Sequence, residues 1–163
     1  MCGPALVKLL IPRETAPGER RVAATPETVR RLVVKGATLQ VERGAGQAAG
    51  FLDADYAAVG AELWDGDAAA WGAVDGELCV QPPRSEDLGR LREEALLVGL
   101  LAPYGATALV AALNGRRASA IALELLPRIT RAQSMDVLSS QANIAGYKAV
   151  LLAAAASIAT CRC

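Results

Sequence analysis

A polar segment between residues 124 and 147 carries the side chains best suited to hold a ligand. At about 100° per residue, they fall within one arc of about 120° on a helix. They are Gln133, Asp136, Ser139, Ser140, Asn143 and Tyr147, with Arg128 just before them. Solvent-facing helix surfaces are usually rich in Lys and Glu, whereas this arc has only Asp136 as a charge. The pattern leaves open a surface that hydrogen-bonds a polar ligand or partner segment and an ordinary solvent face.

The absence of histidine limits the chemistry that this segment can support. With no histidine in the chain, Ser-His-Asp and Cys-His catalysis and histidine-ligated metals are excluded. The four cysteines, Cys2, Cys79, Cys161 and Cys163, are too few for a disulfide scaffold and lack partners for a metal site. We therefore expect no metal, and we expect a reducing cytoplasm because the first residues lack a signal-peptide pattern.

Composition favours a compact protein without a polyanionic partner. The 163 residues are 53% hydrophobic but only 4% aromatic, and 17 basic residues balance 17 acidic ones. Nucleic-acid binding needs a basic excess, so it is not expected. Residues 95–113 carry no charge over nearly the length of a membrane span, but Pro103 and Gly105 interrupt them. A strand, a turn and a short helix account for this run, and we expect no membrane insertion.

The elements that must position these residues follow an alternating pattern. Strands are predicted at residues 6–11, 38–42, 77–80, 96–101 and 117–123. Helices are predicted at residues 26–35, 53–59, 88–94, 106–113 and 131–159. Such alternation implies crossover connections. The predicted fold is α/β, a Rossmann-like or flavodoxin-like open, mainly parallel sheet with helices on both faces and a long C-terminal helix. We expect residues 1–130 to form the α/β domain and residues 131–163 the long helix.

Two loops near strand ends invite a functional interpretation. The glycines at 44, 46 and 50 have the spacing G-x-G-x-x-x-G, one residue longer than a dinucleotide fingerprint. We therefore favour a structural glycine loop over a nucleotide site. Arg20 and Arg21 follow the first predicted strand. In a parallel sheet such a pair could meet an anion, although a solvated surface pair is the simpler interpretation.

One long run resembles the signature of the NAD-binding component of proton-translocating NAD(P) transhydrogenases. It is residues 126–150, LPRITRAQSMDVLSSQANIAGYKAV. These enzymes belong to the alanine dehydrogenase/transhydrogenase family. The runs 19–26, 41–46, 49–56 and 101–103 resemble it too. Alanine dehydrogenases share this N-terminal architecture, but that resemblance would bring a lysine before the proline pair and a histidine after the next strand. Gln81 precedes Pro82 here. The complete absence of histidine therefore favours the transhydrogenase.

The resemblance implies direct hydride transfer from NADH to NADP+, with no side chain acting as acid or base. Arg128, Gln133, Asp136 and Ser139 would contact or position the nicotinamide end of NAD(H). Arg128 and Ser139 would serve the carboxamide, and Gln133 the ring and ribose facing NADP(H). Asp136 would fix Arg128 or the ribose. Gln133 and Asp136 are the residues expected to matter most for catalysis.

The resemblance also implies partners and further parts. A partner component would bind NADP(H), and another would span the membrane and carry the proton channel. The full subunit would be a homodimer, cytoplasmic and held at the inner membrane by these partners. In the family a second, NAD-binding Rossmann domain follows the long helix, but residues 153–163 do not resemble that continuation. We therefore expect a fragment that binds NADH very weakly and is inactive alone. The alternatives are the N-terminal domain of an alanine dehydrogenase-like enzyme and a non-catalytic interaction domain.

Overall fold

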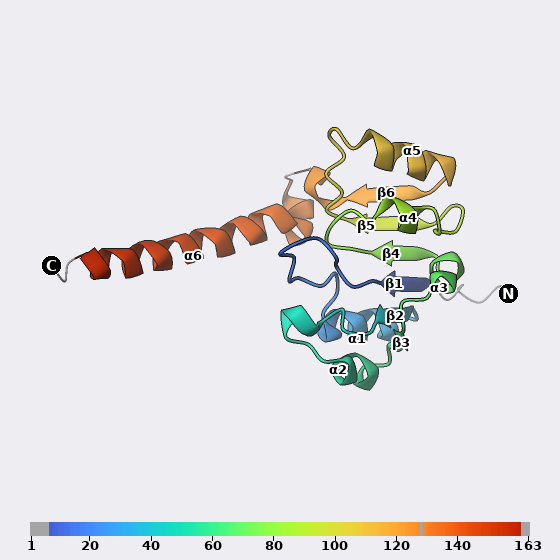
Figure 1. The fold of residues 1–163 in the computed structure, drawn as a ribbon, viewed down its shortest axis with the longest axis horizontal. Helices are drawn as coiled ribbons and strands as arrows, with labels where there is room; N and C mark the ends of the chain where they lie inside the picture. Colours follow the sequence, from blue (N-terminus) through green and yellow to red (C-terminus); the bar gives the residue numbers. More distant parts are fainter. Residues whose placement is uncertain (1–6, 128, 161–163) are drawn as a thin grey trace. The chain divides into compact units, whose positions relative to one another are not determined.

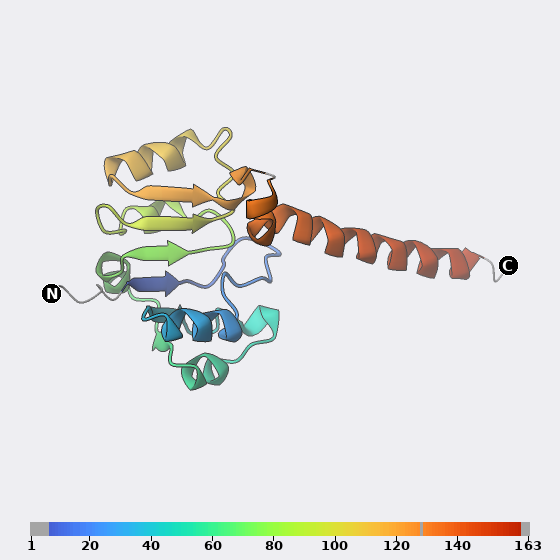
Figure 2. The same cartoon turned by 180° about the vertical axis from the view of Figure 1, so that it is seen from behind.

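An open, all-parallel sheet of six strands forms the centre of the N-terminal part of the chain (Figure 1). The computed structural model describes residues 7–127 and 129–160. The strands are β1 (Lys8–Ile11), β2 (Thr38–Glu42), β3 (Glu62–Trp64), β4 (Gly76–Leu78), β5 (Leu96–Gly99) and β6 (Ser119–Ala122). They lie in the order β3-β2-β1-β4-β5-β6, and the same stack is visible from behind (Figure 2). This confirms the predicted α/β class and parallel sheet.

Helices cover both faces of this sheet. They are α1 (Pro26–Val34), α2 (Asp53–Ala58), α3 (Ala68–Ala73), α4 (Ser85–Leu88) and α5 (Thr107–Gly115), with a short 3-10 helix, η1 (Gln47–Ala49). Ile11 joins a core with α1 and α2, whereas Leu10 joins one with α3, α4 and α5. Because successive side chains of a strand point to opposite faces, the sheet separates two hydrophobic cores.

Local sequence explains why α1 is so close to its predicted bounds. The Thr25 hydroxyl accepts a hydrogen bond from the Thr28 amide at 3.3 Å, and Pro26 occupies the first turn. Val29 is fully buried. Gly36 ends the helix at a φ of 92°, a conformation that favours glycine.

Three elements of this unit differ from the prediction. The strand β3 and helix α3 were not predicted. They are short, and the surrounding run is rich in alanine and glycine, so neither shows a clear period. The helix predicted at residues 88–94 is wrong: α4 occupies Ser85–Leu88 instead. The acidic first turn of Glu86 and Asp87 favours a helix start at this earlier position.

The chain divides into two compact units, Met1–Ala122 and Leu123–Cys163. The second unit contains two 3-10 helices, η2 (Leu123–Leu125) and η3 (Thr130–Met135), and the long helix α6 (Val137–Thr160). The single helix predicted at residues 131–159 is therefore broken. Asp136 separates η3 from α6, because its carboxylate caps the first turn of α6 instead of continuing a helix.

Over the described residues, no helix has the length and apolar character that crossing a membrane requires. The uncharged run at residues 95–113 contains β5, a turn and most of α5, as predicted.

Candidate functional site

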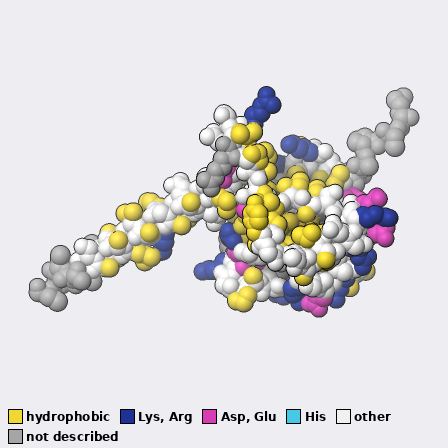
Figure 3. All heavy atoms as spheres, turned by 90° about the horizontal axis from the view of Figure 1, so that it is seen from above, with side chains coloured by type: hydrophobic (Ala, Val, Ile, Leu, Met, Phe, Trp, Pro, Cys, Tyr) yellow, Lys and Arg dark blue, Asp and Glu magenta, His cyan; other side chains and the backbone are white. Residues whose placement is uncertain are grey.

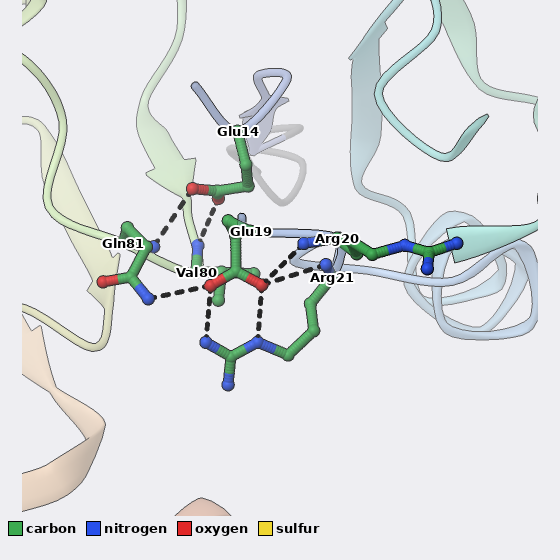
Figure 4. Close-up of polar contacts among 6 residues, drawn as sticks. All are labelled: Glu14, Glu19, Arg20, Arg21, Val80 and Gln81. Atoms are coloured by element: carbon green, nitrogen blue, oxygen red, sulfur yellow. Dashed lines mark hydrogen bonds and ion pairs between the residues drawn. The ribbon is translucent and has the colours of Figure 1, made fainter. Parts of the chain in front are cut away.

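The sheet has its topological switch point between β1 and β4. The chain proceeds from β1 toward β2 and β3 on one side and from β4 toward β5 and β6 on the other. In open α/β sheets, ligands bind beyond the carboxyl ends of the strands at such a point. Here the segments that leave β1 and β4 meet through a group of polar residues, Glu14, Glu19, Arg21 and Gln81 (Figure 4).

Glu14 joins the two segments through backbone amides. Its two carboxylate oxygens accept hydrogen bonds from the amides of Val80 and Gln81, the second at 3.1 Å. Burial raises the pKa of Glu14 above its usual value, although these two amide bonds oppose the shift. Glu14 thus fixes the backbone that follows β4 to the loop that follows β1.

Glu19 organises the other half of the group. Its carboxylate accepts two hydrogen bonds from the Arg21 guanidinium, at 2.7 and 2.6 Å, and one from the Gln81 side-chain amide at 2.8 Å. The bonds from Arg21 lower the pKa of Glu19 to about 2. The simpler interpretation of the basic pair is therefore wrong for Arg21, which is half-buried in an ion pair, whereas Arg20 is exposed.

A cavity of about 460 Å³ opens beside this group. Its wall includes two aromatic residues, Trp64 and Trp71, and the acidic residues Glu77 and Asp87. Glu77 lies in β4 and is completely buried, and neither of its carboxylate oxygens has a hydrogen-bond partner among the described residues. Burial raises the pKa of Glu77 to about 8, and the charges of Asp87 and Glu14 add to the shift. Glu77 therefore changes its ionisation close to neutral pH at this edge of the sheet.

In the second unit, three of the four predicted site residues lie around the start of α6. Asp136 accepts hydrogen bonds from the Ser139 amide at 3.0 Å and from the Ser139 hydroxyl at 2.6 Å. The structure thus brings Asp136 and Ser139 together. Gln133 lies one turn earlier, exposed in η3. Arg128 lies outside the described residues, so its predicted place beside them stays a prediction.

The predicted single polar arc does not exist as one helical face. Gln133 belongs to a 3-10 helix and Asp136 to the break, so only Ser139, Ser140, Asn143 and Tyr147 follow the period of α6. Hydrophobic side chains are also exposed along α6 (Figure 3). Ile144, Val150 and Leu152 are among them.

The glycine loop has a structural role at one position. A side chain at Gly46 would meet the Tyr56 ring at 2.7 Å and Phe51 at 2.9 Å. Tyr56 is buried and donates a hydrogen bond to the Ala24 carbonyl at 2.9 Å. Gly46 is therefore required for packing around Tyr56, in line with the interpretation favoured from its spacing.

The cavity and its acidic residues are features that the sequence predictions do not include. Glu77 stands within an apolar strand that was itself predicted, and a charged residue in a strand covered on both faces is a signal of unusual burial. By contrast, no local pattern joins Glu14 to Val80, since 66 residues separate them.

The comparisons with known proteins identify the family. Residues 10–145 match the family model described as "Alanine dehydrogenase/PNT, N-terminal domain". This match extends over most of the chain, and the chain belongs to this family.

Its relatives include both classes that the family description names. The chain is 43% identical over 150 residues to an alpha-subunit component of the NAD(P) transhydrogenase of Rhodospirillum rubrum, covering 89% of this chain and 39% of that protein. It is 32% identical over 144 residues to alanine dehydrogenase of Mycobacterium tuberculosis, covering 88% of this chain and 38% of that protein. The chain thus spans less than half the length of these relatives.

Solved structures agree with these relatives. A transhydrogenase from Sinorhizobium meliloti has a TM-score of 0.84 at 41% identity, covering 90% of this chain and 44% of that one. An L-alanine dehydrogenase has a TM-score of 0.68 at 31% identity, covering 72% of this chain and 32% of that one. The chain is related to both enzymes.

Proposed function

We propose that this chain is the N-terminal part of the NAD(H)-binding subunit of a proton-translocating NAD(P) transhydrogenase. The observation that carries the proposal is the 43% identity to the Rhodospirillum rubrum transhydrogenase subunit, against 32% to the mycobacterial alanine dehydrogenase. The higher TM-score of the transhydrogenase structure supports the same choice. So does Gln81, which stands where the alanine dehydrogenase resemblance would bring a lysine.

The chemistry of the second unit fits the nicotinamide end of a dinucleotide. The Ser139 hydroxyl, the Gln133 amide and the Asp136 carboxylate can hydrogen-bond a carboxamide and ribose hydroxyls. The glycine loop offers a pyrophosphate few free amides, because the Gly44 amide is bonded to the Asp53 carboxylate at 2.8 Å and the Gln47 amide to the Gly44 carbonyl at 3.1 Å. This supports a role for the chain at one end of the coenzyme, with further binding supplied by another domain.

In this role the residues of the chain position the nicotinamide end of the coenzyme. They do not transfer protons. Bound NADH supplies the hydride, which passes directly to the nicotinamide of NADP+ on a partner component. Ser139 and Arg128 would orient the carboxamide, and Gln133 the ring and ribose. Asp136, already bonded to the Ser139 hydroxyl, would keep that hydroxyl in place. Holding the reactants in register lowers the barrier without any acid or base.

The proposed assembly includes parts beyond these 163 residues. A second domain would complete the NAD(H) site, and partner components would bind NADP(H) and carry the proton channel. The full subunit would form a homodimer on the cytoplasmic side of the inner membrane, held there by its partners. Alone, the chain would bind NADH very weakly and transfer no hydride.

The test is a chimera. Residues 10–145 of this chain replace the matching residues of the Rhodospirillum rubrum subunit, which is assayed with its own partner components. We expect NADH-dependent reduction of an NADP+ analogue and no NAD+-dependent oxidation of alanine. Oxidation of alanine by the chimera would select the alanine dehydrogenase alternative.

A second measurement tests the isolated chain. NADH is titrated into it while the coenzyme fluorescence is followed. We expect no saturation at micromolar concentrations, and micromolar binding would contradict the proposed division of the site between domains.

A further inference from the structure

Strand β6 forms an open edge of the sheet. It pairs with β5 alone, and Ser119, Ala120 and Ile121 are exposed. The Ser119 amide donates to the Ala95 carbonyl on the β5 side. Because the backbone groups of successive strand residues point to opposite sides, those of Ala120 and Ala122 point away from β5. β6 therefore presents N–H and C=O groups with which another strand could pair.

The opposite edge of the sheet is protected in a way that β6 is not. β3 is three residues long and carries Glu62, and the Asp65 that follows it pairs with Arg43. Short and charged edge strands discourage pairing between molecules. β6 has four residues, Ser-Ala-Ile-Ala, with no charge and no proline. Of the two edges, β6 is the one suited to pairing with another chain.

Helix α5, which precedes β6, lacks the charged outer surface of a helix that faces water. α1 and α5 are both nine residues long, and the exposed positions of α1 include Glu27, Arg30 and Arg31. By contrast, α5 has no charged residue, and its Val110 is 44% exposed. Ile121 of β6 is 43% exposed, and hydrophobic side chains gather over this edge of the sheet (Figure 3). A helix that is apolar on all sides is normally covered.

We propose that β6 and α5 form an interface with a second copy of this chain. The two β6 strands pair antiparallel about a twofold axis at Ile121, which joins the two sheets into one. Ala120 of each copy then exchanges hydrogen bonds with Ala122 of the other, through the groups that point away from β5. Ile121 lies opposite its own equivalent at a non-hydrogen-bonded position, where side chains are closest.

The absence of charge on this surface favours a second copy as the occupant. A twofold axis brings a charged residue near it close to an identical charge, which is unfavourable. β6 and α5 contain no charged residue, so their equivalents meet without this cost. A charged partner, such as an acidic peptide, would find no opposite charge there. The proposal does not depend on the coenzyme role, because self-association and hydride transfer are measured separately and each can fail alone.

Analytical ultracentrifugation of the chain under reducing conditions tests the interface. We expect a mass twice the 16.9 kDa of one chain. Ile121→Lys places two like charges at the axis and should shift the mass to that of one chain. Ala120→Pro removes an amide that β5 does not use and should do the same. Val34→Lys on α1 and Val150→Lys on α6 replace exposed valines elsewhere, and both should stay dimeric.

Disulfide trapping tests the register of the two strands. The background is a chain whose Cys2, Cys161 and Cys163 are changed to serine. In it, Ile121→Cys places two thiols on Cα atoms about 4.5 Å apart, within the range of a disulfide. We expect a covalent dimer when oxidised glutathione is added. Ser119→Cys is the matched control on the same strand, since its two copies lie about 13 Å apart along the strands and should not join.

Three results would overturn the proposal. They are a wild-type chain with the mass of one chain, a dimer that persists in both Ile121→Lys and Ala120→Pro, and a dimer lost only in Val150→Lys, which would assign self-association to α6. Should Ile121→Lys fail to fold by circular dichroism, Val110→Lys on the exposed part of α5 replaces it. A covalent dimer through Ser119→Cys and not through Ile121→Cys would contradict the register.

Discussion

The polar groups at the carboxyl edge of β1 and β4 and those at the start of α6 are held in different ways. At the sheet edge, Glu14 and Glu19 join segments more than sixty residues apart and are partly or largely buried. At the start of α6, Asp136 bonds Ser139 and Ser140, three and four residues further along the chain, and Ser139 is exposed. The first group is fixed by long-range contacts of the fold, whereas the second is built around a helix cap.

This difference indicates how each region can act. A group fixed by long-range bonds keeps its geometry without a ligand, so its effects should appear first in folding stability. A group built on local bonds can adapt, and its effects should appear first in catalysis within a larger assembly. Substitutions in the two regions should therefore differ in both the size and the kind of their effect.

The largest effect on stability is expected from Glu77. Its pKa is 4.5 unfolded and about 8 folded, so both states hold the proton at low pH. Between these values the unfolded state loses the proton while the folded state retains it, and stability falls as pH rises. The free energy of unfolding should drop by about 3–5 kcal/mol from this residue between pH 5 and pH 9. Urea unfolding measures it.

Glu77→Gln is the matched variant for this pH dependence. It should remove most of the fall in stability and leave the variant more stable than wild type above pH 8. Glu27→Gln, a change on the exposed surface of α1, should preserve the wild-type profile. A Glu77→Gln profile parallel to wild type would contradict the burial of an unpaired carboxyl.

A smaller effect is expected from Glu14. Glu14→Ala leaves the amides of Val80 and Gln81 without their acceptor, which should cost about 2 kcal/mol in urea unfolding. Glu14→Gln keeps one accepting oxygen and should lose about half as much. The exposed Glu86 supplies the control, since Glu86→Ala should change stability by less than about 0.5 kcal/mol. Equal losses at the two positions would remove the special role of Glu14.

The smallest effect on stability is expected at the cap of α6. Asp136→Ala should cost about 1 kcal/mol of helix stability, because the Ser139 amide loses its acceptor. Asp136→Asn should cost much less, since asparagine caps helices about as well. Far-UV circular dichroism during thermal unfolding reports both. Asn143→Ala, in the exposed interior of the same helix, is the control, and a loss there as large as in Asp136→Ala would contradict the cap.

How far the sequence predicted these features depends on the range of the interactions. The parallel sheet and α1 follow from alternation and from the Thr25-Pro26 start, which are local signals. The signal for the break at Asp136 is also local, but a run without proline and with Gly146 as its one glycine concealed a favourable cap. The link between Glu14 and Val80 depends on which strands become neighbours, and no pattern within either segment contains that information.

The most direct measurement is hydride transfer in the chimeric transhydrogenase subunit carrying Gln133→Asn or Asp136→Asn. If this segment positions the nicotinamide, each change should lower the rate by about 100-fold while the subunit stays folded, because misplacement of about 1 Å has that effect. Gln141→Asn, the same chemical change within α6, should leave the rate unaltered. Unchanged transfer in both Gln133→Asn and Asp136→Asn would contradict the account.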